Sequence, residues 1–308
     1  MKKKNLLLRL VVLVTAMMCT LGAAAAEAYA CYTSSNATLT FYYDSQRSSR
    51  TGTTYDLNTG DSDTGWDTDG TNASVTKVVF DPSFASARPT TTCDWFHNMK
   101  NLESITGMEY LNTSEVTNMN WMFLKCSKLT SVDVSHFNTS KVTSMYSMFN
   151  SCTGLTSLDL SSFNTSKVAV MYRMFYNSTN LRTIYVGNGW STAAVYGSTE
   201  MFNYCTSLVG GQGTTWNNSN PKDKTYAHID GGPSNPGYFT AKPAYVRGDV
   251  NSDGYVDIND VTTLIDVVLG KPVTYNASAA DCNVYGGDNL VDINDVTSLI
   301  NHLLYGTW

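Results

Sequence analysis

An aromatic position that returns at a fixed interval organises the middle of this chain. Phenylalanine stands at Phe96, Phe123, Phe149, Phe175 and Phe202, at intervals of 26 or 27 residues. Each is preceded by tryptophan or methionine and is followed six residues later by a leucine. A unit of this length cannot bury its apolar face alone, so neighbouring units must stack to form a shared core. We therefore expect a row of similar units.

The clearest unit reads LTSLDLSSFNTSKVAVMYRMFYNSTN, and its L-x-x-L-x-L pattern is typical of a leucine-rich solenoid. The pattern predicts one short strand per unit, at 132–134, 158–160 and 184–186. A turn at F-N-T-S follows, and then a helical return such as 141–149, which Thr139 or Ser140 would cap. The predicted core contains Met145, Met148, Phe149, Leu155, Leu158, Leu160 and Phe163.

The repeat carries a specific motif, MF-x-x-C-x-x-L-x-x-L-D-L-S-x-F-N-T-S-K-V. It resembles the BspA-like, 26-residue leucine-rich repeats of bacterial surface proteins over residues 75–240. Within this range, 226–240 is similar to the end of such arrays and predicts a C-terminal cap. The resemblance implies an α/β leucine-rich-repeat fold and a binding role.

Cysteine recurs at one position of the repeat, three residues after the phenylalanine, as Cys126, Cys152 and Cys205. Other units place Met99 and Ser178 there. A position that accepts Cys, Met or Ser predicts buried packing rather than a disulfide or redox pair.

Near the C-terminus, residues 248–270 space oxygen-bearing side chains around one hard cation. The pattern D-x-N-x-D-G, followed by five residues and an acid, is that of an EF-hand calcium loop, with Asp260 in place of the usual Glu. The predicted ligands of this loop are Asp249, Asn251, Asp253, Tyr255 through its carbonyl, Asp257 and Asp260. An apolar stripe on a short helix follows, formed by Val261, Leu264, Ile265, Val268 and Leu269.

The sequence VDINDVTTLI (256–265) returns as VDINDVTSLI (291–300), with one difference. Two loop–helix units from Gly248 to the C-terminus resemble a type I dockerin module, which folds on calcium and binds a cohesin domain of another protein. The second loop departs from the pattern, because it aligns only if Tyr285-Gly286-Gly287 is an insertion. Its predicted calcium ligands are Asp281, Asn283, Asp288, Leu290, Asp292 and Asp295.

The dockerin resemblance also implies which residues contact the partner, because these modules present such residues just after the calcium-binding turn. The matching positions are Ile258, Asn259, Thr262, Thr263, Ile293, Asn294, Thr297 and Ser298. The near-identity of the halves predicts a pseudo-twofold surface that binds in either of two orientations.

The first thirty residues combine basic residues, an apolar run and small residues, which predicts a signal peptide cleaved near Ala28 or Ala30. No second apolar stretch of this kind follows, so we expect no transmembrane segment in the mature chain. Cys31 leaves a lipid anchor open as an alternative to free secretion. A net charge of −6 with sparse lysine and arginine argues against nucleic-acid binding.

The segment 31–94 is β-prone, with predicted strands at 37–43 and 74–80. A polar loop between them holds four aspartates whose spacing fits no metal-ligand template, which predicts a solvated loop. Five surface residues of the repeats suggest an aromatic column, for which sugar or peptide binding competes with half-buried packing. These residues are Trp121, Tyr146, Tyr172, Tyr185 and His136.

Little in the sequence indicates catalysis. The four histidines, His97, His136, His228 and His302, belong to no recognisable catalytic or metal motif. Asp133 and Asp159 are an exposed carboxylate pair, but they recur by repetition, which favours a solvated strand face over glycoside hydrolysis.

Together these features predict an α/β leucine-rich-repeat solenoid with a β-rich N-terminal cap, plus a small α-helical calcium-binding dockerin domain. The predicted order is a signal peptide (1–30), N-terminal cap (31–94), repeats (95–209), C-terminal cap (210–240), linker (241–247) and dockerin (248–308). The predicted function is that of an exported non-catalytic binding protein, attached to a cohesin-bearing extracellular assembly associated with polysaccharide degradation. The alternatives are a stand-alone surface adhesin with a structural calcium module and a carbohydrate-active hydrolase component.

Overall fold

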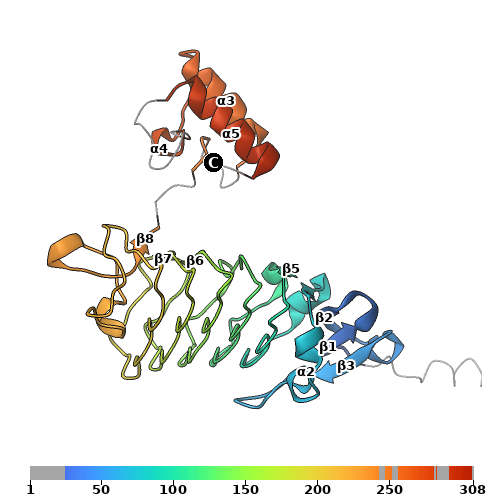
Figure 1. Cartoon of the computed structure of the whole chain (residues 1–308). Coiled ribbons are helices and arrows are strands. Elements are labelled where there is room, and N and C mark those ends of the chain that lie inside the picture. The colour runs from blue at the N-terminus through green and yellow to red at the C-terminus, as the bar shows by residue number, and fades with distance from the viewer. Residues whose placement is uncertain (1–24, 243–246, 252–255, 281, 283–290, 307–308) are drawn as a thin grey trace, which may run out of the picture. The chain divides into compact units, whose positions relative to one another are not determined.

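The computed structural model describes residues 25–242, 247–251, 256–280, 282 and 291–306. Their contacts divide the chain into two compact units, Met1–Lys242 and Pro243–Trp308, shown in Figure 1. The strands are β1 (Glu27–Thr33), β2 (Thr38–Asp44), β3 (Thr53–Asp56), β4 (Lys77–Phe80), β5 (Ser104–Thr106), β6 (Ser157–Leu160), β7 (Thr183–Val186) and β8 (Thr240–Ala241). The α-helices are α2 (Gly65–Thr68), α3 (Ile258–Val268), α4 (Ala277–Ala280) and α5 (Ile293–Tyr305). Short 3₁₀ helices are η1 (Ser34–Asn36), η2 (Arg47–Ser49), η3 (Thr71–Ser74), η4 (Pro82–Ser86), η5 (Met108–Tyr110), η6 (Lys224–Tyr226) and η7 (Gly232–Ser234).

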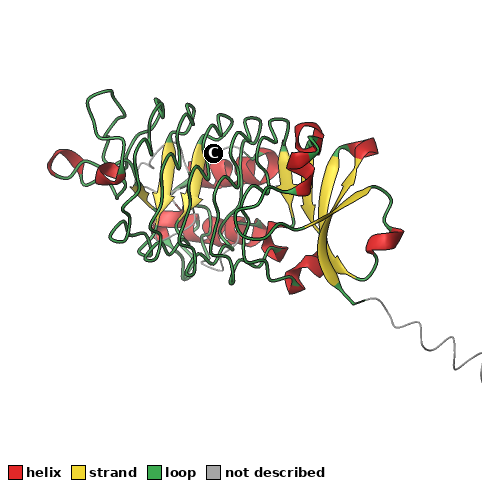
Figure 2. Ribbon diagram, turned by 90° about the horizontal axis from the view of Figure 1, so that it is seen from below, coloured by secondary structure: helices red, strands yellow, loops and turns green. Residues whose placement is uncertain are grey.

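The first unit begins with a five-stranded sheet in the order β3-β1-β2-β4-β5, seen in Figure 2. The first three strands pair antiparallel, and β4 and β5 join in parallel. Phe41 of β2 anchors the core, with ring centroids 4.6 Å from Phe80 and 5.0 Å from Trp95. β2 and β4 confirm the strands predicted at 37–43 and 74–80.

Strand β1 contains the last residues of the predicted signal peptide (1–30), of which residues 1–24 lie outside the described part of the chain. Tyr29 and Ala30 are fully buried in this strand, and the Tyr29 hydroxyl donates a hydrogen bond to Asp44 at 2.7 Å. A leader ending at Ala30 would remove four of the seven residues of β1. The sheet therefore conflicts with the boundary at residue 30 and with a lipid anchor on Cys31, which is buried in the same strand.

Beyond this sheet, successive repeats lie side by side in parallel. One backbone position per repeat forms a parallel bridge to the next, linking Thr91, Asn118, Ser144, Val170 and Gly197 in turn. The repeated phenylalanines stack along the interior, with neighbouring ring centroids 5.3 to 6.1 Å apart. The whole predicted core set from Met145 to Phe163 is buried. Each fully buried Phe contributes about 1.5–3 kcal/mol through removal of apolar area from water.

The prediction of an α/β leucine-rich-repeat solenoid is wrong, because the described repeats have no helical return. Residues 141–149 contain a β-bridge at Ser144 and a turn from 146 onward, and no α-helix occurs anywhere in the described range 69–242. The backbone explains this: residues two before and two after each phenylalanine are left-handed, such as Ser147 (φ 51°) and Ser151 (φ 58°). A right-handed helix cannot pass through such residues. The result is a mainly β- and turn-built unit, in which β6 and β7 confirm two predicted strands while 132–134 forms none.

The Asn-Thr-Ser triplets join one repeat to the next instead of capping a helix. The Thr139 hydroxyl is buried, donates to the Asn164 carbonyl at 2.9 Å and accepts from the Asn164 N–H at 2.8 Å. The Asn138 side chain accepts from the Ser140 N–H and so closes a local turn. Thr113 makes the same two bonds to Asn138 one repeat earlier.

The repeated cysteines are buried free thiols, as predicted, but they also have a bonding role. The Cys152 Sγ–H donates to the Phe123 carbonyl at 3.0 Å, and Cys126 and Cys205 contact the equivalent carbonyls of Phe96 and Phe175. Ser178 makes the same bond to Phe149. Burial raises the pKa of Cys152 to about 12, which keeps the thiol protonated as a donor.

The far end of the first unit is closed by a turn-rich segment around a buried carboxylate. Strand β8 pairs with β7 and completes a three-stranded parallel sheet with β6. The Asp230 side chain accepts hydrogen bonds from the N–H groups of Gln212, Thr214, Gly232 and Gly237 and from the Thr214 hydroxyl, at 2.7 to 3.3 Å. Burial opposes ionisation of this carboxyl, but these donors outweigh it and lower the pKa to about 2.

Within its described residues the second unit is only partly helical, which corrects the expectation of a small α-helical domain. Helices α3 and α5 pack together around a small core, and α4 is a single turn. The core residues are Val250, Val261, Leu264, Ala280, Cys282, Val296 and Leu299. None of the described helices is both long and apolar enough to cross a membrane.

Candidate functional site

The two long helices of the second unit begin in the same way. Asp257 precedes α3, and its carboxylate accepts the Asn259 N–H at 2.7 Å, while Asp260 accepts the Asp257 N–H at 2.8 Å. Asp292 and Asp295 make the same reciprocal pair at the start of α5, at 2.7 and 2.8 Å. Each pair is a capping box, which satisfies backbone donors that a helix start leaves unpaired.

Asp260 and Asp295, the predicted last ligand of each loop, also accept a backbone hydrogen bond from the start of that loop. Asp260 and Asp295 are fully buried. The second oxygen of Asp260 accepts the Asn251 N–H at 3.1 Å, and that of Asp295 accepts the Cys282 N–H at 2.6 Å. A carboxylate has about four lone-pair sites, so Asp260 accepts these two bonds and keeps acceptor capacity for a cation. Both residues thus fit the closing-ligand role in an oxygen-lined site.

Several predicted ligands lie outside the described residues: Asp253, Tyr255, Asp281, Asn283, Asp288 and Leu290. Asp249, which is buried, and Asn251 are described at the start of the first loop. Within the described part of the chain, no three acidic, histidine or cysteine side chains converge in the way a metal ion requires. The calcium-ligand set therefore stays a prediction, with Asp257, Asp260, Asp292 and Asp295 placed at the two helix starts.

The predicted partner-contacting residues lie on the outer faces of α3 and α5. Ile258 and Ile293 are the first residues of their helices and are 67% and 62% exposed. Asn259, Thr262, Asn294 and Thr297 are exposed, and Thr263 and Ser298 are half-buried. The hydroxyls of Thr262, Thr263 and Thr297 donate to the carbonyls four residues earlier.

Sequence reasoning missed a second apolar stripe on each helix. Ile265 and Leu269 were predicted to share one helix face with Val261, Leu264 and Val268, but they are 39% and 65% exposed, whereas Val261 and Leu264 are buried. The docking stripe of α3 is Ile258, Thr262, Ile265 and Leu269, and that of α5 is Ile293, Thr297, Ile300 and Leu304. Both follow an i, i+4, i+7, i+11 spacing, which places each set on one helix face. The signal was in the sequence, because the helix carries apolar residues on more than one face.

In the first unit, the structure brings three of the five predicted surface aromatics together. The Trp121 and Tyr146 ring centroids are 5.2 Å apart, and those of Tyr146 and Tyr172 are 6.3 Å apart. All three side chains are half-buried. Tyr185 lies in β7 instead, and His136 lies beside Asp133.

The aspartate-rich loop before the repeats is not simply solvated. Asp67 accepts from Asn72 and contacts His97 Nδ1 at 3.0 Å, Asp69 accepts from the Tyr55 hydroxyl, and Asp61 accepts from Asn118. These bonds fix the loop against the first repeats. The side chains of Asp133 and of Asp159, which lies in β6, accept the N–H of the residue two positions later, and Asp159 also pairs with Lys242 at 2.6 Å.

Comparison with known families matches two parts of this chain. Residues 247–304 match the Dockerin type I domain, and residues 90–216 match a family described as "Mycoplasma protein of unknown function, DUF285". No curated protein and no solved structure matches. The C-terminal unit is thus a type I dockerin domain, a class that binds calcium and supports assembly with a cohesin partner. The identity of the repeats as 26-residue leucine-rich repeats is not confirmed, and both matched domains are non-catalytic classes.

Proposed function

We propose that this chain is an exported, non-catalytic binding protein that docks, in the presence of calcium, onto a cohesin domain of an extracellular polysaccharide-degrading assembly. The observation that carries the proposal is the duplication in the second unit. Two helices begin with the same capping box and display the same exposed apolar stripe. The match of residues 247–304 to the Dockerin type I domain supports this reading.

Calcium would be held in the first loop by the oxygens of Asp249, Asn251, Asp253, Asp257 and Asp260 and by the Tyr255 carbonyl. The corresponding second-loop residues are those predicted from the sequence. A bound cation supplies positive charge that offsets repulsion among these carboxylates, so metal binding adds to folding free energy. Asp260 and Asp295 then couple the loops to the helices, because each already bonds to both.

The two docking stripes would form the contact surface for the cohesin domain. Exposed isoleucine and leucine side chains gain free energy by leaving water, at about 25 cal/mol per Å² of apolar area buried. The flanking Asn259 and Asn294 supply polar contacts at the rim. Since the stripes carry almost the same residues, either helix can occupy the same site on the partner.

A binding measurement tests this proposal. Purified full-length chain is titrated onto an immobilised type I cohesin domain with calcium and with chelator, and we expect binding only with calcium. Asp260→Ala combined with Asp295→Ala should weaken binding by at least about a hundredfold, because both loops lose the carboxylate that joins them to a helix. Asp266→Ala is the matched control, since this acid of α3 lies outside the loop and pairs with Lys271. Equal binding in chelator would contradict the proposal.

The proposed export also predicts where the signal peptide is cleaved. Tyr29 and Ala30 are buried in β1, so the mature chain must retain them. We expect cleavage before Glu27, after the small residues Ala24–Ala26. Mass spectrometry of the N-terminal peptide from an exporting host should show Glu27 as the first residue. A mature chain that begins at Cys31 would contradict the central position of β1.

A further inference from the structure

A pocket in the first unit lies beside the row of aromatic rings, and neither matched domain class assigns it a role. The Trp121 pocket is a cavity of about 200 Å³ lined by Asp63, Asp94, His97, Trp121 and Leu124. Its walls come from the polar loop before the repeats and from the first two repeats. The aromatic row, formed by Trp121, Tyr146 and Tyr172, continues from it along the next repeats.

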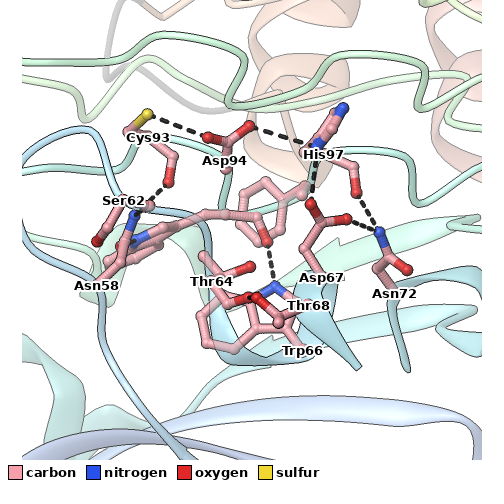
Figure 3. A network of polar contacts seen from close by, with 12 residues as sticks. Asn58, Ser62, Thr64, Trp66, Asp67, Thr68, Asn72, Cys93, Asp94 and His97 are labelled. Atoms are coloured by element: carbon pink, nitrogen blue, oxygen red, sulfur yellow. Dashed lines mark hydrogen bonds and ion pairs between the residues drawn. The ribbon is translucent and has the colours of Figure 1, made fainter. Parts of the chain in front are cut away.

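Asp94 and His97, two of the residues that line the pocket, belong to a polar network, which Figure 3 shows. Asp94 has 4% of its side chain exposed, and its carboxylate accepts from the Cys93 thiol at 3.3 Å. His97 Nδ1 lies 3.4 Å from Asp94 and 3.0 Å from Asp67. Because both neighbours are carboxylates, Nδ1 carries the proton. This network orients the pocket residues before any ligand arrives, which lowers the cost of binding.

The buried carboxylate of Asp94 has only weak or long contacts to hydrogen-bond donors, namely the Cys93 thiol and His97 Nδ1. A thiol is a weak donor, and the imidazole contact is long, so the carboxylate oxygens of this pocket-lining residue keep lone pairs for a further donor. Burial raises the pKa of Asp94 above its usual value, with Asp63 and Asp67 adding to the shift. A hydroxyl group of a ligand would supply a short, strong bond to such an oxygen.

We propose that the Trp121 pocket and the aromatic row bind a single chain of a neutral oligosaccharide. Sugar rings have apolar C–H faces that pack on aromatic rings, and hydroxyl edges that donate to carboxylates. The pocket is smaller than the roughly 300–1,000 Å³ of sites that enclose a whole drug-sized ligand. It therefore holds one ring of a longer chain, and the row carries the rings that follow.

The charge distribution favours a neutral chain over a basic peptide. Carboxylates lie at the pocket end of the row, whereas the other end carries Arg173, next to Tyr172 and paired with Glu200 at 2.6 Å. A basic peptide would find counter-charges at one end only and would pass a guanidinium at the other. The rings also meet at 80° and 65°, which forms a ridge and suits one chain better than a flat crystalline surface.

Calorimetric titration of the full-length chain tests the proposal with four neutral probes: cellohexaose, xylohexaose, mannohexaose and fully N-acetylated chitohexaose. Hexalysine is the cationic probe. We expect at least one hexasaccharide to bind and hexalysine not to bind. Trp121→Ala should weaken the binding about tenfold or more, because a stacked ring loses its partner. Tyr172→Ala tests the other end of the row with a second variant, should Trp121→Ala disturb folding.

Two controls separate this site from others. Tyr204→Ala removes a tyrosine that is 53% exposed and packs on Tyr176 outside the row, and it should leave binding unchanged. The Asp260→Ala/Asp295→Ala chain should bind the same hexasaccharide normally, so failure of docking and failure of this site are distinguishable. The proposal is overturned if no hexasaccharide binds, if Tyr204→Ala and Trp121→Ala lose binding equally, or if hexalysine binds in a Trp121-dependent way.

Discussion

Both units are built from duplicated sequence, but duplication serves opposite purposes in them. In the first unit the repeated residues point inward: the stacked phenylalanines, the leucines and the thiols bonded to the preceding repeat. Its candidate site lies where the repeats differ, since Trp121 occupies the position that Asp94, Ser147, Arg173 and Glu200 hold in other repeats. In the second unit some repeated residues, such as Val261 and Val296, are buried in the core, but others point outward as two equal stripes. The candidate site of the first unit therefore depends on residues that differ between repeats. That of the second unit depends on exposed residues that are the same in both halves.

The largest expected effect is on an inward repeated residue. Phe149→Ala removes a ring stacked 5.3 Å from Phe123 and 6.1 Å from Phe175. It should lower the free energy of unfolding of the first unit by about 3–5 kcal/mol, because a cavity is left in a close-packed core. Denaturant titration followed by tryptophan fluorescence reports on this unit, which holds Trp66, Trp95, Trp121, Trp190 and Trp216.

The matched change on an outward repeated residue is Ile258→Ala. It should alter the unfolding free energy of the second unit by less than about 0.5 kcal/mol, since this side chain is mostly in water. Calcium-loaded chain followed by circular dichroism measures it. A loss as large as that of Phe149→Ala would show that the stripe is part of a core, and the contrast between the units would fail.

A smaller effect than that of Phe149→Ala is expected at Asp230, a buried carboxylate that contrasts with Asp94. Asp230 receives five hydrogen bonds from its own chain, so it is structural. A pKa lowered from 3.8 to about 2 corresponds to about 2 kcal/mol of stability. This stabilisation is complete above about pH 4 and is lost as the pH falls through about 2, because the folded state binds the proton more weakly than the unfolded state.

Asp230→Asn should therefore cost about 2 kcal/mol at neutral pH, and the difference from the wild type should shrink as the pH falls toward 2. Thermal unfolding at several pH values measures both. A cost that does not change with pH would show that the side chain acts through packing and not through its charge. Asp133→Asn, on an exposed turn, is the control and should show little change.

An effect smaller than that at Asp230 is expected at the repeated thiols. Cys152→Ala should cost about 1 kcal/mol, because the buried Phe123 carbonyl loses its donor. Cys152→Ser should cost less, since Ser178 already makes this bond at the same position of the next repeat. Denaturant titration of both variants checks the order. Equal costs would mean that the position only fills space.

The sequence was sufficient to predict the period, the buried residues of the repeats and the helices that follow the two acidic loops, because each depends on local spacing. It was insufficient for the return path of the repeats. Ser147 and Ser151 are left-handed in the structure, yet serine gives no signal of that conformation. The spacing therefore predicts a helix at 141–149 that does not form. The sequence also could not predict the Trp121 pocket, because the pocket is lined both by Asp63, from the loop before the repeats, and by Trp121, from the second repeat. The predicted stripe placed Ile265 and Leu269 on one face with the buried Val261 and Leu264, because a period alone does not show which residues are covered.

The central claim is that the two halves of the dockerin unit are equivalent docking surfaces. Titration of a type I cohesin domain with Ile258→Asp, Ile293→Asp and the double variant, all in calcium, tests it most directly. We expect each single variant to lose about a factor of two in affinity, because one of two orientations remains, and the double variant to lose binding. If one single variant alone abolishes binding, the stripes are not equivalent and the account is wrong.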